Sequence, residues 1–199
     1  MRLVKTPLIA CMLVGSVIAA KDHLPFWSSI SFMEASLLFL AGLMAGIRLP
    51  DIDLVLPGFS HRSGITHSCV APLIFWMSGL PAIAAGLALG VGMHMASDLQ
   101  PKSWVGGALI KFPMLGSIGL MSPLWILAHI LGCAFIWLDV MSVSGVLDRQ
   151  LMFMVSLLGA LWYFTREEKK PILPMLSLGF SLLLVHATRE GILSISVFL

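Results

Sequence analysis

The side chains best suited to chemistry in this chain are histidines and aspartates gathered in two short segments. The first segment, residues 49–68, reads LPDIDLVLPGFSHRSGITHS, and the second, residues 92–99, reads GMHMASDL. Together they supply a set of potential metal ligands: Asp51, Asp53, His61, His67, His94 and Asp98. Imidazole nitrogens and carboxylate oxygens suit zinc best here, and also manganese or iron. The sequence therefore predicts a site for one or two divalent metal ions.

The chemistry expected of such a site is hydrolysis of a phosphoester, such as a lipid head group or a similar small molecule. Carboxylates this close to an apolar region repel one another and resist desolvation, and a cation removes both costs. A bound metal ion lowers the pKa of a coordinated water molecule to about 7, which produces a hydroxide nucleophile. We expect Asp53 to act as general base if it does not coordinate, and Arg62 to bind a substrate phosphate through two hydrogen bonds. Thr66 and Ser68 are further candidate hydrogen-bond donors to the substrate.

The spacing of these residues supports convergence. His94 and Asp98 are four residues apart, so on a helix they lie about 40° apart on one face. Asp51 and Asp53 are two residues apart, so an extended segment directs both side chains to the same side. Taken singly, each group also has a simpler interpretation: a Pro-Asp turn, a polar residue at a helix end, a hydrogen-bonded helix pair, or an arginine facing lipid head groups.

The elements that must position these residues are membrane helices. The chain has 199 residues, of which 58% are hydrophobic and 11% charged, whereas soluble domains carry about 25% charged residues. The net charge of +2, without a cluster of lysines and arginines, argues against nucleic-acid binding and leaves membrane lipids as the expected partners. The three cysteines stand singly in apolar runs and are typical of small buried side chains.

Hydropathy predicts an all-α polytopic bundle with about five spanning helices and one helical hairpin, forming a single domain over residues 1–199. A span needs roughly 17–25 mostly apolar residues, and the candidate spans are residues 3–20, 31–49, 122–141, 150–165 and 171–188. Residues 3–20 also resemble a signal peptide, but we expect a retained helix because no convincing cleavage site precedes Lys21.

The hairpin is predicted between residues 67 and 98. As one helix this stretch would be about 48 Å long, which exceeds a bilayer core of about 30 Å. Gly79 and Pro81 mark a turn, so we expect arms over residues 67–78 and 82–98. Helix 31–49 then ends, the first arm begins, and the second arm returns at the same membrane face. This arrangement brings the candidate ligands together within a motif-bearing core, residues 40–105.

The distribution of lysine and arginine favours the hairpin and orients it. With one continuous helix the twelve basic residues divide six to six, whereas with the hairpin nine lie on the N-terminal side and three opposite. Cytoplasmic loops carry the excess of lysine and arginine. We therefore expect the site to lie at the cytoplasmic face of the membrane. If the protein is bacterial, this membrane is the inner membrane.

Other ionisable residues are weaker candidates. His129 lies about 10 Å along helix 122–141, and an intramembrane histidine is a functional candidate by default. We keep open whether it reaches the site. His23, His186 and Glu34 are expected to be polar residues at the opposite membrane boundary.

Three motifs in order, LPDID, HRSGITHS and HMASDL, resemble the membrane-bound metal-dependent hydrolase family (YdjM-like), which is similar in outline to zinc-dependent phospholipase C. The resemblance covers about residues 40–105. It implies phosphoester hydrolysis, with Asp51, Asp53, His67, His94 and Asp98 as ligands and His61 as a further one.

The chain also departs from that family's pattern. Leu54 follows Asp-Ile-Asp where many members have histidine, residues 1–20 lack a histidine, and Gln100-Pro101 replaces a common Thr-Pro. These departures leave open one metal ion or two. They also leave two alternatives to a phosphoester hydrolase: a divalent metal-ion transporter or carrier, and a non-catalytic membrane protein that keeps the metal site.

Overall fold

The computed structural model describes residues 31–55, 61–99, 109–113, 115–166 and 171–192. These residues form an all-α bundle, as predicted, with two very short strands. The helices are α2 (Ser31–Arg48), η3 (Pro50–Leu54), α3 (Val70–Met77), α4 (Pro81–Asp98), η6 (Gly119–Met121), α5 (Ser122–Val143), α6 (Val146–Arg166) and α7 (Ile172–Arg189). The predicted span 3–20 and His23 lie outside the described residues.

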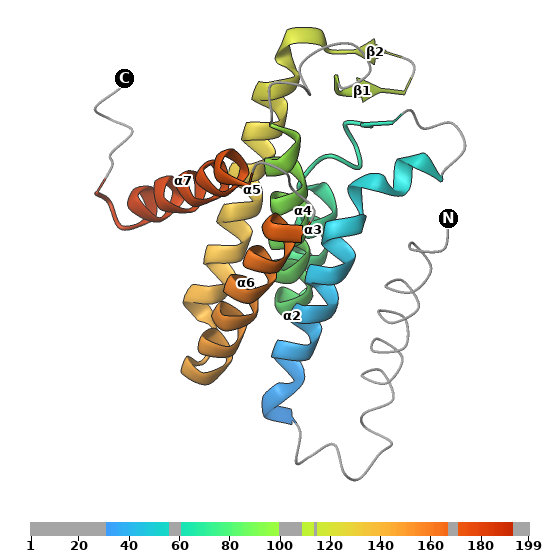
Figure 1. The fold of residues 1–199 in the computed structure, drawn as a ribbon. Helices are drawn as coiled ribbons and strands as arrows, with labels where there is room; N and C mark the ends of the chain where they lie inside the picture. The colour runs from blue at the N-terminus through green and yellow to red at the C-terminus, as the bar shows by residue number, and fades with distance from the viewer. Residues whose placement is uncertain (1–30, 56–60, 100–108, 114, 167–170, 193–199) are drawn as a thin grey trace.

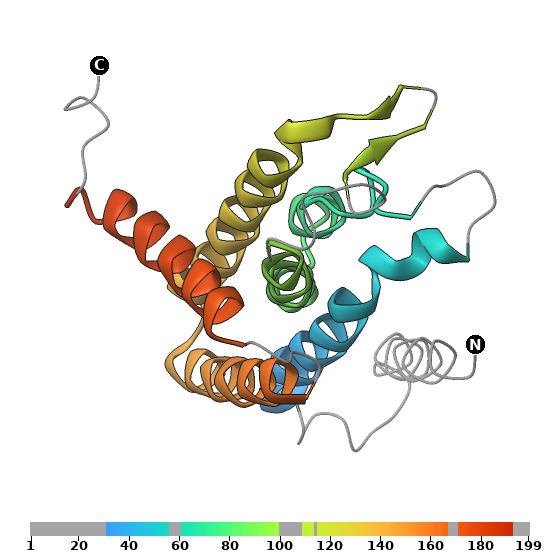
Figure 2. The ribbon, with the colours of Figure 1, turned by 45° about the horizontal axis from the view of Figure 1, so that its top comes forward.

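Helix α4 forms the centre of the bundle. It packs against α2, α3, α5 and α7, which surround it in Figure 2. Nearly all of its length is buried, from Ala82 to Ala96, and alanine, glycine and leucine dominate it. Because α4 is enclosed by its neighbours, the polar residues in its last turn are held in a fixed place. The core thus acts as a rigid support for His94 and Asp98.

Helices α2 and α4 approach each other very closely through paired glycines. Gly42 and Gly46 on α2 face Gly86 and Gly90 on α4, and a Cβ at any of them would collide with backbone atoms of the other helix. Small residues spaced by four allow helix backbones to touch in this way, which is common in membrane bundles. This contact fixes the distance between the end of α2 and the end of α4, where the candidate ligands lie.

The predicted hairpin is present as α3 and α4. Gly79 has a positive φ of 76°, and the backbone N–H groups of Gly79 and Leu80 donate to the carbonyls of Trp76 and Phe75. These are the two bonds of a Schellman helix ending, which favours glycine at this position. Pro81 then begins α4, where a missing N–H costs nothing. The turn signal in the sequence therefore acts as expected.

The first arm begins later than predicted. Helix α3 starts at Val70 instead of residue 67, because residues 63–69 form turns held by side-chain and backbone hydrogen bonds. A short hairpin, β1 (Lys111–Phe112) and β2 (Gly116–Ser117), supports these turns from the side (Figure 1). Lys111 exchanges backbone hydrogen bonds with Arg62 and Gly64. The segment carrying His67 is thereby fixed to residues that follow it by more than forty positions.

Two of the described helical segments are long and apolar enough to cross a membrane by length and composition: Gly119–Val143 and Ile172–Arg189. The predicted segments 31–49, 122–141, 150–165 and 171–188 coincide with α2, α5, α6 and α7. Their helical nature is confirmed, and the number of spans stays a prediction.

Candidate metal centre

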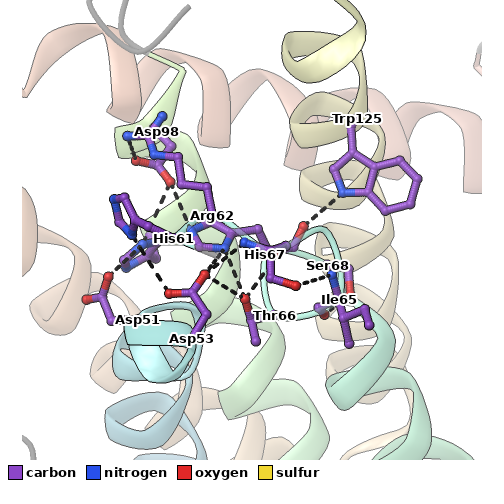
Figure 3. Close-up of polar contacts among 12 residues, drawn as sticks. Asp51, Asp53, His61, Arg62, Ile65, Thr66, His67, Ser68, Asp98 and Trp125 are labelled. Carbon is purple, nitrogen blue, oxygen red and sulfur yellow. Dashed lines mark hydrogen bonds and ion pairs between the residues drawn. The ribbon is translucent and has the colours of Figure 1, made fainter. Parts of the chain in front are cut away.

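Three separate parts of the chain bring the predicted site residues together. Helix η3 carries Asp51 and Asp53, the turns before α3 carry His61 to His67, and the last turn of α4 carries His94 and Asp98. Figure 3 shows the carboxylates of Asp53 and Asp98 on either side of the His67 ring. The convergence predicted from the sequence is therefore present in the fold.

The centre of the cluster is formed by His67, His94 and Asp98, whose candidate ligand atoms all lie within 4.8 Å of one another. Asp98 Oδ2 lies 3.4 Å from His67 Nε2 and 3.8 Å from His94 Nε2. His67 Nε2 and Asp98 Oδ2 are both buried, and apart from their contact with each other neither has a hydrogen-bond partner among the described residues. Buried polar atoms without partners are costly, and a metal ion bound between them would satisfy both. These three residues could hold a metal ion.

The ring of His94 is oriented by a hydrogen bond on the side away from the cluster. Its Nδ1 lies 3.1 Å from the carbonyl oxygen of Ile47, at the end of α2. A carbonyl only accepts, so Nδ1 carries the proton and donates it, which leaves the Nε2 lone pair directed at the cluster. Histidine ligands of metals are usually held by such a bond on the second nitrogen.

Asp53 occupies a position behind His67. Its side chain is fully buried, and its Oδ2 accepts hydrogen bonds from the Ser63 backbone N–H at 2.8 Å and the Thr66 hydroxyl at 3.2 Å. The same oxygen lies 3.6 Å from His67 Nδ1, so the carboxylate favours a proton there and a free lone pair on Nε2. Oδ1 of Asp53 is buried without a hydrogen-bond partner in the described part of the chain.

Asp51 and His61 flank this centre. Asp51 Oδ1 lies 3.8 Å from His94 Nε2, and His61 Nδ1 lies 3.8 Å from Asp53 Oδ1. The His61 side chain is 49% exposed, so it lines the opening of the site. The expected extended segment at residues 50–54 is instead a 3-10 helix. With three residues per turn, Asp51 and Asp53 point in different directions, which is why only Asp53 is buried behind His67.

Arg62 is held inside the cluster. Among the described residues other than glycine, Arg62 alone has a positive φ, which is 62°. Its side-chain Nη2 lies 2.7 Å from Asp98 Oδ1. One oxygen of Asp98 thus binds Arg62 while the other faces the two histidines. The guanidinium neutralises part of the carboxylate charge and fixes its orientation.

The hydroxyl groups of Thr66 and Ser68, which were predicted to bind substrate, form hydrogen bonds that stabilise the turns before α3. Thr66 donates to the Ser63 carbonyl or to Asp53, and Ser68 donates to the Ile65 carbonyl at 2.6 Å. Figure 3 shows the Ser68 side chain directed at Ile65, away from the His67 ring. Thr66 remains at the edge of the site, whereas Ser68 stabilises the turn before α3.

The electrostatic environment prepares His94 and Asp98, in the last turn of α4, for metal binding. Burial lowers the pKa of His94, an effect that the nearby carboxylates of Asp98 and Asp51 oppose without cancelling it. For Asp98, burial acts to raise the pKa, but the closeness of His67, His94 and Arg62 outweighs it and the pKa is lowered. A neutral imidazole and an ionised carboxylate are the forms that bind a metal ion.

Sequence reasoning missed the residues that support the site from a distance. The indole N–H of Trp125 on α5 donates to the His67 carbonyl at 3.1 Å (Figure 3), and the backbone of Ile47 holds His94. Neither has a local sequence signal, because backbone acceptors carry no pattern and Trp125 is 58 positions away in the chain.

His129 does not join the three-residue ligand cluster. Its Nδ1 accepts a hydrogen bond from the Cys69 backbone N–H at 3.3 Å and lies 3.2 Å from Cys69 Sγ. Its ring packs against Trp125, with centroids 4.3 Å apart. His129 therefore stabilises the start of α3. His186 lies in the last turn of α7, beside the Arg189 that pairs with Asp139 near the opposite end of α5.

Comparison with known proteins adds no relative: the chain matches no protein family, no curated protein and no solved structure. The functional argument therefore depends on the geometry of the site.

Proposed function

We propose that this protein is a membrane-embedded, metal-dependent hydrolase of a phosphoester, with zinc as the favoured ion. The observation that carries the proposal is the convergence of His67 Nε2, His94 Nε2 and Asp98 Oδ2, with Asp98 Oδ2 lying 3.4 and 3.8 Å from the two nitrogens. In the described part of the chain, the buried atoms His67 Nε2 and Asp98 Oδ2 contact each other and make no other hydrogen bond, so a metal ion between them would satisfy both. The likeness of the three motifs to the YdjM-like hydrolases supports the same chemistry.

A location within the membrane follows from the apolar surface. Large hydrophobic side chains are exposed along α5, α6 and α7, including Leu124, Phe153 and Phe180 at more than half of their area. Water-soluble proteins rarely expose so much contiguous apolar surface. Together with two helices able to cross a bilayer, this supports the polytopic bundle, with α3 and α4 as a hairpin that enters and returns. The distribution of basic residues supports a site at the cytoplasmic face.

The residues of the site have distinct roles in this proposal. A divalent ion would supply a Lewis acid and a more acidic water molecule. His67, His94 and Asp98 would hold the ion, and Asp51 would be placed to complete its ligands. The Oδ1 atom of Asp53, which has no hydrogen-bond partner among the described residues, can accept a proton, and the exposed ring of His61 beside it can pass that proton to solvent. The guanidinium of Arg62, which lies beside the cluster through its bond to Asp98 Oδ1, would bind a phosphate oxygen of the substrate.

Ion transport is less well supported by the same fold. A transporter needs polar groups along a path through the bilayer. Helix α4, which forms the centre of the bundle, buries alanine, glycine, leucine and other apolar residues from Ala82 to Met93. Its polar residues are confined to the last turn. The site is therefore a feature of one end of the bundle.

The first test is the metal content of purified protein. We expect about one divalent ion per chain in wild type, loss of that ion in His94→Ala and in His67→Ala, and full content in His186→Ala, which is the matched control. Stoichiometric metal in a combined His67, His94 and Asp98 variant would contradict the metal centre.

The second test concerns the phosphoester. Arg62→Lys keeps a positive charge beside Asp98 but loses the planar guanidinium, so turnover at saturating metal should fall about ten- to a hundredfold, the value of one charge-assisted hydrogen bond, and by more than the metal affinity falls. Phosphate release from a panel of lipid and soluble phosphoesters measures this. If wild type with full metal hydrolyses none of them, the non-catalytic and transport alternatives gain.

A further inference from the structure

An apolar groove of about 390 Å³ lies between α2 and α6. Leu40, Leu43, Met44 and Ile47 line it on α2, and Gly159 and Trp162 are among the residues that line it on α6. Almost all of its wall is carbon. Gly159 keeps it open, since a Cβ there would come within 2.9 Å of Leu43 Cδ2. The groove follows α2 for about 10 Å, from Leu40 to Ile47.

The groove leads to the metal centre. Its last α2 residue, Ile47, is the residue whose carbonyl oxygen binds His94 Nδ1 at 3.1 Å. Asp51 follows one turn later and lies 3.8 Å from His94 Nε2. A molecule lying in the groove would therefore have one end beside the candidate ligands. The groove and the polar site thus adjoin each other at the C-terminal end of α2.

The two helices that line the groove both end in an arginine. Helices α2 and α6 run in the same direction in Figure 1, so their C-terminal ends lie at the same end of the groove. Those ends carry Arg48 and Arg166, and Arg166 is four residues after Trp162, on the same face of α6. Tryptophan prefers the membrane interface, and arginine beside it binds anionic head groups. The groove thus matches an amphiphile with a negatively charged head.

We propose that this groove binds one acyl chain of an anionic phospholipid, with the phosphate at the end next to the metal centre. The inference deepens the proposed function by naming its substrate class, and it rests on that function for the membrane location. The chain occupies the apolar wall of α2 and α6, and the head group lies between the arginines and His94.

Lipid binding to the purified protein in detergent tests the groove without requiring turnover. Native mass spectrometry during titration with phosphatidylglycerol or phosphatidylcholine should show one tight site in wild type that prefers phosphatidylglycerol. Gly159→Leu fills the groove and should weaken that site at least tenfold. Gly179→Leu on α7 is the matched control, because a Cβ there meets nothing. Leu40→Trp fills the groove from the other helix and serves if Gly159→Leu fails to fold.

Wild-type affinity in both blocking variants, or loss in the control as well, would overturn the proposal. A photoreactive benzoylphenylalanine at Leu158, which also lines the groove, identifies the occupant. Cross-linking to residues 3–20 of the same chain, or to a second copy, would overturn it as well. Metal content measured on the same samples separates the two proposals: bound metal without lipid contradicts only the groove, and bound lipid without metal contradicts only the hydrolase.

Discussion

Replacing Asp53 by asparagine tests whether Asp53 is a metal ligand, as the sequence allowed, or a carboxylate that supports His67, as its position in the structure indicates. Asparagine has nearly the same shape, and its carbonyl oxygen can still accept from Ser63 N–H and the Thr66 hydroxyl, now 2.8 and 3.2 Å from Oδ2. It loses the negative charge that faces His67 Nδ1 at 3.6 Å. The perturbation therefore acts mainly on the protonation and orientation of one candidate ligand.

The size of the effect follows from that position. Removing a carboxylate that supports a histidine ligand typically costs ten- to a hundredfold in metal affinity. This is about 1.4–2.8 kcal/mol of binding free energy. By contrast, loss of a direct ligand should abolish tight binding. Asp53→Ala should also destabilise the fold by about 1–3 kcal/mol, because it leaves the buried Ser63 N–H without its acceptor.

Zinc affinity measured by competition with a chromophoric chelator, at fixed pH and in the same detergent, gives the answer. Asp148→Asn, in the first turn of α6, is the matched control and should bind like wild type. Unchanged affinity in Asp53→Asn would refute the supporting role. Complete loss of metal with an intact circular dichroism spectrum would show that Asp53 is itself a ligand, and the supporting role inferred from its position behind His67 would then be wrong.

Three further predictions concern packing, pH and topology. Gly86→Leu should unfold the bundle or lower its thermal midpoint by many degrees, because the new side chain would meet the backbone of Phe39 on α2. Thermal unfolding of the protein in detergent measures this change, and a wild-type midpoint would contradict the close packing. Burial lowers the pKa of His94 below its usual 6.5, so on acidification the unfolded chain binds the proton before the folded chain does, and the stability of the metal-free protein should fall as the pH drops below about 6.5. Chemical denaturation at a series of pH values measures this, and the pH profile of His94→Gln should be flatter. Single cysteines at Leu115 and Val143, both well exposed, should label from opposite sides of the membrane in a cysteine-free background; labelling from one side would refute the orientation.

Much of the fold could be predicted from local signals. Runs of apolar residues of bilayer length are helical in every described case, since a long apolar segment must satisfy its backbone hydrogen bonds internally. Gly79 and Pro81 predicted the hairpin turn because glycine adopts a positive φ without steric cost, and proline has a fixed φ and no N–H to satisfy at a helix start. The spacing of His94 and Asp98 placed both on one face of α4, and the structure brings them to the same cluster.

The tertiary structure decided what the local signals could not. Asp51 and Asp53 were expected to point to the same side, but the 3-10 helix turns one toward His94 and the other behind His67. Arg62 binds Asp98 because a positive φ, held by pairing with Lys111, brings it back over α4. Such contacts join positions far apart in the chain, so no sequence period reports them.

The sequence by itself thus determined the helices, the hairpin and the residue types of a metal centre, because these follow from hydropathy, backbone preference and ligand chemistry. Only the tertiary structure decided which nitrogen of His94 faces the cluster, which carboxylate supports His67, and that an apolar groove lies between α2 and α6. The physical reason is that orientation depends on hydrogen bonds from distant backbone atoms. The groove depends on the space left between two packed helices.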